Sequence, residues 1–181
     1  MKKAVIFLAT GFEETEAVGT IDVLRRGGID VMISSVTGSK TVTGAHGISI
    51  KSDVLFNEME YNDIDAFVLP GGMPGSSNLN AYIPLKELLI SKYKEEKIIA
   101  AICAAPLVLG GLGLLKGRSV TCYPGFESKL IGATPSGGPV EVDGNIITGK
   151  GPGLVFHFGL AIVKALKGTS VAEEVASGLL L

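Results

Sequence analysis

The sequence has 181 residues, a length that suits one domain, and we expect a single domain over residues 1–181. Hydrophobic residues make up 46% of the chain, which is enough for a core, and the 25 glycines lack the period of collagen. The formal net charge of −2 excludes the basic surface that binds nucleic acid or anionic membranes. We therefore expect neither nucleic acid nor a membrane among its partners.

The N-terminal third of the chain predicts strand, helix, strand and a β excursion. The apolar run over residues 3–9 is typical of a buried strand. Residues 13–28 predict a helix, because acids open it and two arginines lie in its last turn, as the helix macrodipole favours. A second strand is predicted over residues 29–36. Residues 40–56 alternate in polarity between glycine turns, which indicates short β segments.

The middle of the chain continues this alternation. The segment DAFVLPGG, residues 65–72, predicts a buried strand that ends in a glycine turn. A helix is predicted over residues 84–96, which begin with proline. The run KIIAAIC, residues 97–103, predicts another buried strand, and residues 105–115 predict a helix rich in small residues.

The last third of the chain predicts a strand over residues 118–122 and a hairpin over residues 139–149 that turns at Asp-Gly. Helices are predicted over residues 152–168 and 170–180. Buried strands that alternate with helices indicate βαβ units, and therefore an α/β fold with a mainly parallel sheet. In such sheets, sites lie beyond the carboxyl ends of the strands.

Two segments superficially resemble membrane signals. The chain begins with lysines before a short apolar stretch, but no small-residue cleavage site follows and acidic residues come at once. Residues 98–115 carry no charge, but Pro106 and several glycines divide this run into strand, turn and helix. Cys103 and Cys122 lack the spacing of a redox or zinc motif and suit a reducing compartment. We therefore expect a cytoplasmic protein.

Cys103 is the candidate nucleophile. The pattern Ala-Ile-Cys-Ala-Ala, residues 101–105, places small residues around a thiol where a strand turns sharply into a helix. A helix that begins just after Cys103 would favour the thiolate and lower the pKa of the thiol. The amide of Ala104 would then lie where an oxyanion forms. The alternative is that Cys103 is only a small buried hydrophobic residue.

Two further strand ends carry candidate groups. Gly71 and Gly72 follow a neighbouring strand, and their exposed N–H groups could complete an anion-binding nest, although an ordinary tight turn would look the same. Glu13, Glu14 and Glu16 open the first helix, where acids are commonly surface residues that match the dipole. A protonated glutamate beside Cys103 could hydrogen-bond a thiolate, while burial and like charge raise its own pKa.

Several other chemistries lack the residues they need. His46 lies in the β excursion, and His157 lies in an apolar helix, where we expect it to be packed. Neither lies at a strand end, so a Cys–His dyad is not expected. Residues 144–151 nearly spell a phosphate-binding loop, but Gly151 replaces its metal-binding hydroxyl. No Cys/His spacing fits zinc. We expect neither a metal nor another cofactor.

Taken in order, the segments GFEETEAV, DAFVLPGG, IIAAICAAP, VTCYP and TGKGPG resemble the ThiJ/PfpI superfamily, and within it the branch of the Parkinsonism-associated protein deglycase. The resemblance runs nearly from end to end. It implies a flavodoxin-like three-layer sandwich and a homodimer. The face of the first helix with Ala17, Val18 and Ile21 is a candidate dimer surface, and equally a candidate for the core of the chain. The resemblance also implies a cofactor-independent glyoxalase, protein deglycation, or sensing of oxidative stress through cysteine oxidation.

The resemblance assigns roles to individual residues. Its nucleophile corresponds to Cys103, its buried glutamate to Glu16, and its oxyanion amides to Gly72 and Ala104. Beside these roles, we expect Gly71 to line the pocket and the hydroxyl of Tyr123 to reach toward Cys103, with packing of the pocket wall as the alternative for Tyr123. Ala104 replaces the histidine that follows the cysteine in the protease-like branch, which argues against peptidase activity.

Tyr123 stands where the deglycase-like pattern often has histidine, and a phenol with a pKa near 10 is a poor base at neutral pH. The leading hypothesis is thus a slow, Cys103-dependent enzyme for small carbonyls such as methylglyoxal. The alternatives are a non-enzymatic redox sensor or chaperone that acts through oxidation of Cys103 and, on the family's naming alone, an amidase or a role in the thiamin pathway.

Overall fold

The structure, a computed structural model, describes residues 1–181. Its main sheet has seven strands in the order β10-β11-β7-β6-β1-β2-β5. All neighbours pair in parallel except β10 and β11, which form an antiparallel hairpin at one edge. The strands are β1 (Lys3–Leu8), β2 (Asp30–Ser35), β5 (Val54–Leu55), β6 (Ala66–Leu69), β7 (Ile98–Ile102), β10 (Val140–Asp143) and β11 (Ile146–Gly149).

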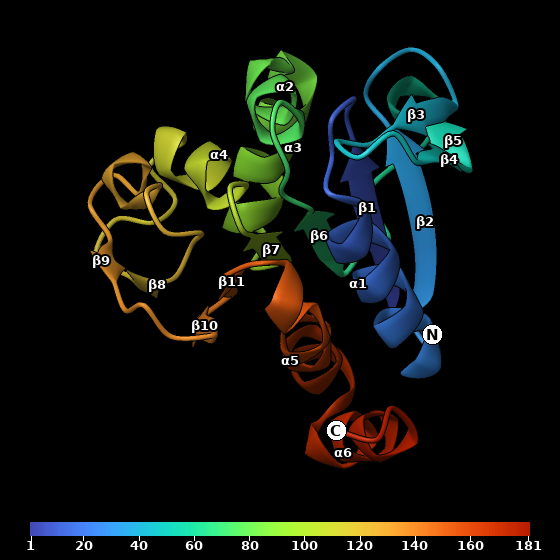
Figure 1. The fold of residues 1–181 in the computed structure, drawn as a ribbon, viewed down its shortest axis with the longest axis vertical. Helices are drawn as coiled ribbons and strands as arrows, with labels where there is room; N and C mark the ends of the chain where they lie inside the picture. The colour runs from blue at the N-terminus through green and yellow to red at the C-terminus, as the bar shows by residue number, and fades with distance from the viewer.

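Six α-helices cover the two faces of this sheet. In Figure 1, the green and yellow helices α2 to α4 lie apart from the blue and red-orange helices α1, α5 and α6. The helices are α1 (Glu14–Arg26), α2 (Gly75–Ala81), α3 (Ile83–Lys94), α4 (Pro106–Gly111), α5 (Val155–Lys167) and α6 (Thr169–Gly178). None of them is both long enough and apolar enough to cross a bilayer.

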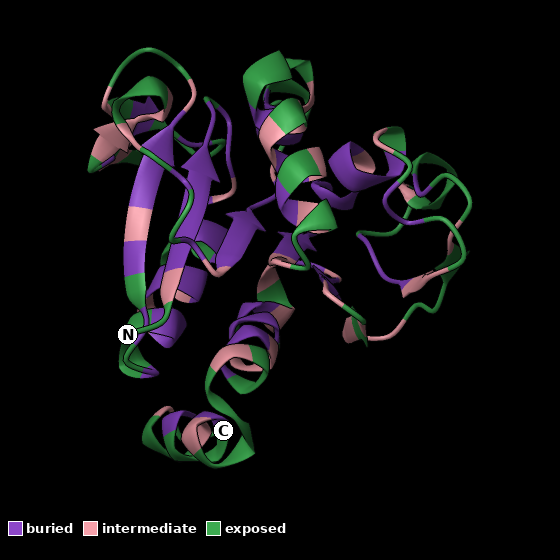
Figure 2. Cartoon of the chain, turned by 180° about the vertical axis from the view of Figure 1, so that it is seen from behind, coloured by how far each residue is buried: buried purple, intermediate pink, exposed green.

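Strand β1 shows why both faces must be covered. Side chains alternate across a strand, and every residue of β1 after Lys3 is buried. Ile6 and its alternate neighbours pack with α1 and α5, whereas Phe7 and its alternate neighbours pack with α2, α3 and α4. Figure 2 shows the same result, with the central strands purple along most of their length.

The predicted fold class is confirmed. Without the edge strands β5 and β10, the parallel strands follow the order second, first, third, fourth, fifth, which is the flavodoxin-like order. Helices on both faces make the predicted three-layer α/β sandwich. The β excursion also forms, as an antiparallel hairpin of β3 (Thr41–Thr43) and β4 (Ser49–Lys51).

Two local predictions need correction, and one helix was not predicted. Residues 118–122 form only a two-residue strand, β8 (Ser119–Val120), which pairs with β9 (Thr134–Pro135) in a separate sheet. The residues after β8 bond elsewhere: the N–H of Thr121 donates to the side chain of Thr148 in β11, and the N–H of Tyr123 donates to the carbonyl of Cys103. The helix predicted over 105–115 ends at Gly111. Helix α2 was not predicted, since its sequence GSSNLNA is typical of a loop and buried Leu79 holds it on the core.

Candidate active site

The predicted site residues meet at the carboxyl ends of the neighbouring strands β1, β6 and β7. Glu16 lies in the first turn of α1, Gly71 and Gly72 follow β6, and Cys103 follows β7. Parallel strands bring their ends to one edge of the sheet, so segments far apart in the chain become neighbours there. Together these residues form the candidate site.

Cys103 occupies the sharp turn between β7 and α4, which we call the elbow. Its φ of 64° lies in the left-handed region, which is strained for a residue with a side chain. Its N–H donates to the carbonyl of Gly149 at 2.9 Å, and its carbonyl accepts from the N–H of Tyr123 at 2.9 Å. The two residues after Cys103, Ala104 and Ala105, are almost completely buried, so larger side chains would not fit there. The residue Cys103 as a whole is only 8% exposed, so only a small reagent can approach it.

Glu16 is completely buried at the start of α1. Its Oε2 accepts a 2.7 Å hydrogen bond from the N–H of Gly71, and its own N–H donates to Oε2 of Glu13 at 2.6 Å. Its Oε1 is buried with no hydrogen-bond partner. A buried carboxyl oxygen without a partner is costly, so this atom is available for a proton or a ligand in the pocket.

Gly71 separates Glu16 from Cys103. A Cβ at this position would lie 2.6 Å from Oε2 of Glu16 and 2.7 Å from Cβ of Cys103. Both distances are closer than carbon atoms tolerate without displacement of their neighbours. Glycine is therefore required for the carboxyl group and the thiol to lie side by side.

The carboxyl and thiol groups shift each other's pKa. Burial is the main cause that raises the pKa of Glu16 to about 7, while Cys103 and the Gly71 N–H oppose this rise. Burial, and then the negative charge of Glu16, raise the pKa of Cys103 to about 12. The pair thus loses its first proton near pH 7 and strongly resists losing the second, because two adjacent buried negative charges repel each other.

This result corrects the expectation of a lowered thiol pKa. Helix α4 begins only at Pro106 and has six residues, whereas burial and the Glu16 carboxylate act directly on the sulfur. The amides of Gly72 and Ala104 do act in the predicted direction, since both lower the pKa of Cys103. Neither amide donates to a backbone carbonyl, so both are free to hold an anion.

Tyr123 reaches the elbow through its backbone. Its N–H binds the carbonyl of Cys103, but its side chain is 46% exposed and its hydroxyl has no hydrogen bond within the chain. The ring passes beside Gly151, where a Cβ would lie 3.3 Å from it. The phenol therefore stands at the edge of the site and does not bond to Cys103 or Glu16.

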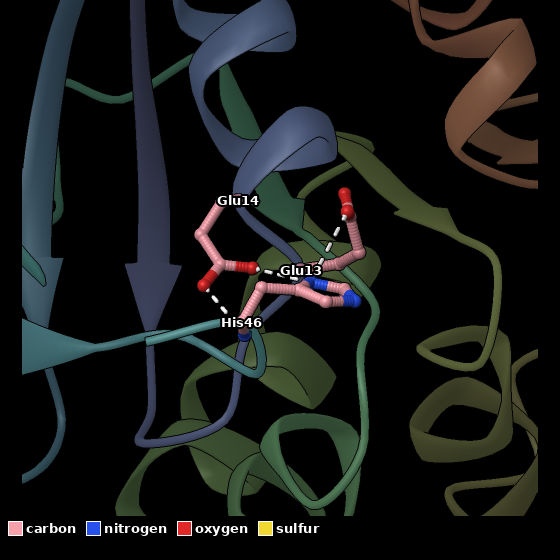
Figure 3. Close-up of side chains that lie close together, drawn as sticks. All are labelled: Glu13, Glu14 and His46. Atoms are coloured by element: carbon pink, nitrogen blue, oxygen red, sulfur yellow. Dashed lines mark hydrogen bonds and ion pairs between the residues drawn. The ribbon is translucent and has the colours of Figure 1, made fainter. Parts of the chain in front are cut away.

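A cluster of Glu13, Glu14 and His46 adjoins the site and was not predicted from the sequence. Nδ1 of His46 lies 2.9 Å from Oε2 of Glu14 and 3.9 Å from Oε1 of Glu13. Figure 3 shows the imidazole between the two carboxylates. Nothing in the sequence spacing reveals this cluster, because the β3–β4 hairpin alone brings His46 back to α1.

The ionisation of the cluster follows its contacts. Hydrogen bonding to Glu14 and its charge raise the pKa of His46. Burial opposes ionisation of Glu14, but His46 and the backbone N–H groups together hold the pKa of Glu14 below its usual value. His157, expected to be packed, is exposed on α5 instead. Neither histidine hydrogen-bonds to the thiol, in line with the absence of a Cys–His dyad.

Comparison with known sequences gives consistent matches. The sequence model of the DJ-1/PfpI family matches residues 2–165. DJ-1 homologs B and A of Arabidopsis thaliana are 41% and 40% identical over 99% of this chain, which spans only 42% and 47% of their lengths. A Caenorhabditis elegans protein named glutathione-independent glyoxalase DJR-1.2 is 35% identical, with 99% of this chain and 97% of that protein aligned.

Solved structures match over nearly the whole chain as well. A cysteine-to-alanine mutant of a DJ-1 superfamily protein from Salmonella typhimurium has a TM-score of 0.95 and 38% identity, with 99% of this chain and 98% of that chain covered. The structure of oxidized Toxoplasma gondii DJ-1 has a TM-score of 0.95 and 35% identity at the same coverage.

Proposed function

The chain belongs to the DJ-1/PfpI family, and from this premise we propose that it is a Cys103-dependent, cofactor-independent enzyme for small reactive carbonyls, similar to a glyoxalase. The observation that carries the proposal is the buried pair of Glu16 and Cys103, held on either side of Gly71. The glyoxalase name of the Caenorhabditis elegans relative supports this choice of reaction.

In this proposal, the reactive state of the pair has one proton. Near neutral pH the pair holds a single negative charge, which the carboxylate and the thiolate compete for. The amides of Gly72 and Ala104 favour the charge on sulfur. Proton transfer from Cys103 to Glu16 therefore creates the nucleophile and the general acid in one step.

The first half of the reaction makes a carbon–sulfur bond. The thiolate adds to the aldehyde carbon of methylglyoxal, and the carbonyl electron pair moves to oxygen. The Gly72 and Ala104 amides hold this oxyanion while Glu16 delivers its proton, which leaves a hemithioacetal. The 8% exposure of Cys103 suits a substrate of this small size.

The second half is an internal redox step and a hydrolysis. Glu16, now a carboxylate, removes the proton from the former aldehyde carbon and returns it to the neighbouring carbon, while the hydroxyl proton of the hemithioacetal moves to the ketone oxygen. The first carbon is thereby oxidised to a thioester and the ketone is reduced to an alcohol. Water then cleaves the thioester, releases lactate and restores the thiol. Methylglyoxal and water thus give lactic acid, and no outside oxidant is needed.

The direct test is conversion of methylglyoxal to lactate by the purified protein without glutathione. We expect slow turnover, since no imidazole assists Glu16 and general acid–base help is worth roughly 10²–10⁴-fold. Cys103→Ser should abolish lactate formation, whereas Cys122→Ser should retain it. Lactate formation that survives Cys103→Ser, or none by the unmodified protein, would contradict the proposal.

A second candidate is a redox sensor in which Cys103 is oxidised to the sulfinate. The solved structure of an oxidized Toxoplasma gondii relative supports this candidate. Mass spectrometry after stepwise peroxide treatment distinguishes the two. A sensor should gain two oxygens on Cys103 at low peroxide and form no lactate beforehand, whereas an enzyme should form lactate before any oxidation.

We also propose a homodimer, with part of its surface on α1. Ala17 and Ile21 are buried in the core of the chain, which was the alternative for this face, so two of the three candidate residues are not available. Val18 is 51% exposed and Ile48 is 59% exposed, and these apolar side chains remain candidates for the contact. Light scattering should give the mass of a dimer for the wild type and the mass of a monomer for Val18→Glu. A monomer mass for the wild type at micromolar concentration would contradict the proposal.

A further inference from the structure

We propose that Glu13, Glu14 and His46 bind a divalent transition-metal ion of the Zn²⁺ type, at a site separate from the Cys103 thiol. The nearest donor atoms of the three side chains all lie within 4.8 Å of one another. The proposal is independent of the carbonyl chemistry, because none of these three residues is required for bond formation at sulfur.

The orientation of the carboxylates resembles that of metal ligands. Oε1 of Glu14 accepts the backbone N–H groups of His46 at 2.7 Å and Ile48 at 3.2 Å. Oε2 of Glu13 accepts the N–H of Glu16. Each carboxylate is thus held by one oxygen and presents the other to the imidazole (Figure 3). Hydrogen bonds of this kind fix the ligands in metal sites.

The spacing of the donor atoms suits a small cation. Ligands of a tetrahedral Zn²⁺ ion lie about 2.0–2.2 Å from the metal, and therefore roughly 3.3 Å from one another. Nδ1 of His46 lies 2.9 Å from one carboxylate and 3.9 Å from the other, which brackets this value. The imidazole side chain is 69% exposed and can rotate to even out the distances. Its exposure also leaves room for water in a fourth position.

The charge of the cluster favours a cation. The side chains of Glu13 and Glu14 are only 12% and 7% exposed, and no lysine or arginine forms an ion pair with either. A divalent ion would balance both carboxylates. It would take the place of the Nδ1 proton between His46 and Glu14, and that proton would be released to solvent.

The donor set selects the class of metal. One imidazole nitrogen with two carboxylates suits Zn²⁺ and its neighbours Co²⁺ and Ni²⁺. Ca²⁺ and Mg²⁺ prefer six or more oxygen ligands and gain nothing from the nitrogen. Three protein ligands without sulfur also set this site apart from any metal that binds the thiol.

The test uses Zn²⁺ titration by calorimetry on chelator-treated full-length protein that carries Cys103→Ser, so that the thiol cannot bind the metal. We expect one Zn²⁺ per chain. Adding His46→Asn or Glu13→Gln should weaken binding by at least about tenfold, which is the loss seen even for residues that only orient ligands. His157→Asn is the matched control, because it removes the other histidine of the chain from the exposed face of α5 and should bind as before.

A second measurement identifies the ligand atom directly. In NMR spectra of the same protein, Zn²⁺ should shift the imidazole nitrogen signals of His46 and leave those of His157 in place. Unchanged affinity in His46→Asn, a shift confined to His157, or zinc binding that disappears with Cys103→Ser alone would each overturn the proposal. Glu14→Gln is not used, because Glu14 also anchors the β3–β4 hairpin.

Discussion

The backbone N–H of Gly71 donates a 2.7 Å hydrogen bond to Oε2 of Glu16, across 55 positions of the sequence. This contact connects the turn after β6 to the first turn of α1 and turns the carboxyl group toward Cys103. The same glycine has no side chain to separate the two reactive groups. The N–H of Gly71 therefore holds the Glu16 carboxyl group in place. The lack of a side chain on Gly71 lets that group lie beside Cys103, as the proposed chemistry requires.

Burial of Glu16 should make stability fall as pH rises. The folded pKa of about 7 lies above the ordinary value of 4.5, so the folded state holds more protons in that interval and stability is lost between about pH 4.5 and 7. At about 1.4 kcal/mol for each pH unit, the loss is about 3 kcal/mol. Glu16→Gln should remove it and raise the free energy of unfolding in urea at pH 7.5 but not at pH 4.

The exposed residue Glu173 provides the control for this measurement, since Glu173→Gln should leave the pH dependence as in the wild type. Glu16→Gln should also abolish lactate formation, because an amide cannot transfer a proton, while Cys103 still reacts with iodoacetamide. A stability difference that is the same at both pH values would mean that Glu16 is not buried as an acid. If Glu13→Gln or Glu14→Gln abolished turnover and Glu16→Gln did not, the assignment of the proton carrier would be wrong.

The two thiols should differ in their reaction with iodoacetamide. Labelling of Cys103 should rise through pH 7, when the pair loses its first proton and the Gly72 and Ala104 amides draw part of the charge to sulfur. The pKa of about 12 for Cys103 describes loss of the second proton of the pair. Cys122 has no such carboxyl partner, and burial, and then Glu127, raise its pKa to about 11, so Cys122 should stay unlabelled until the solution is strongly alkaline. Mass spectrometry of peptides after short pulses measures both rates. Equal labelling of both thiols at pH 8 would contradict the difference.

Gly71→Ala should disrupt the site without unfolding the protein. The added Cβ overlaps the Glu16 carboxylate and Cys103, and such overpacking typically costs 1–3 kcal/mol. We expect a lower free energy of unfolding by about that amount and loss of lactate formation. Gly153→Ala is the matched control, since a Cβ there meets no atom within 4 Å. Full activity in Gly71→Ala would show that the spacing between the two groups is not critical.

The hydroxyl of Tyr123 should contribute little to turnover. It forms no hydrogen bond within the chain, and the anchoring contact to Cys103 is made by the backbone N–H, which a side-chain change leaves in place. Tyr123→Phe should therefore change the rate of lactate formation only modestly. Tyr123→His should raise it, because an imidazole titrates near neutral pH and a phenol does not. A rapid wild-type enzyme that Tyr123→Phe silences would contradict this assignment.

The sequence predicts the layers of the fold and the position of Cys103 for the same physical reason, whereas the choice of Glu16 among the three acids came from the family resemblance. Buried parallel strands appear as unbroken apolar runs, so the ends of β1, β6 and β7 can be located before their arrangement is known. Gly71 and Cys103 lie just after the ends of β6 and β7, and Glu16 lies in the first turn of the helix that follows β1. Helix α2 could not be predicted in this way, because its stability comes from burial of Leu79 and not from the helix preference of its residues.

The electrostatics of the site also depended on the folded geometry. Local sequence suggested a helix dipole that lowers the pKa of Cys103, whereas burial and Glu16 raise it. The cluster of Glu13, Glu14 and His46 forms because the loop of the β3–β4 hairpin folds back onto α1. The separation of these residues in the sequence does not indicate that contact. Tyr123 likewise meets the elbow through its backbone, which a side-chain pattern does not reveal.

The left-handed backbone of Cys103 has a consequence for how this protein can change over generations. At a φ of 64°, any residue with a Cβ is strained by roughly 1–2 kcal/mol, and glycine is not. A single base substitution converts either cysteine codon into a glycine codon, which would relax the turn and delete the thiol together. If Cys103 is the nucleophile, as proposed, loss of the activity lies one mutational step away and is favoured by the backbone, so the proposal requires selection on the sulfur chemistry to keep a cysteine at this turn.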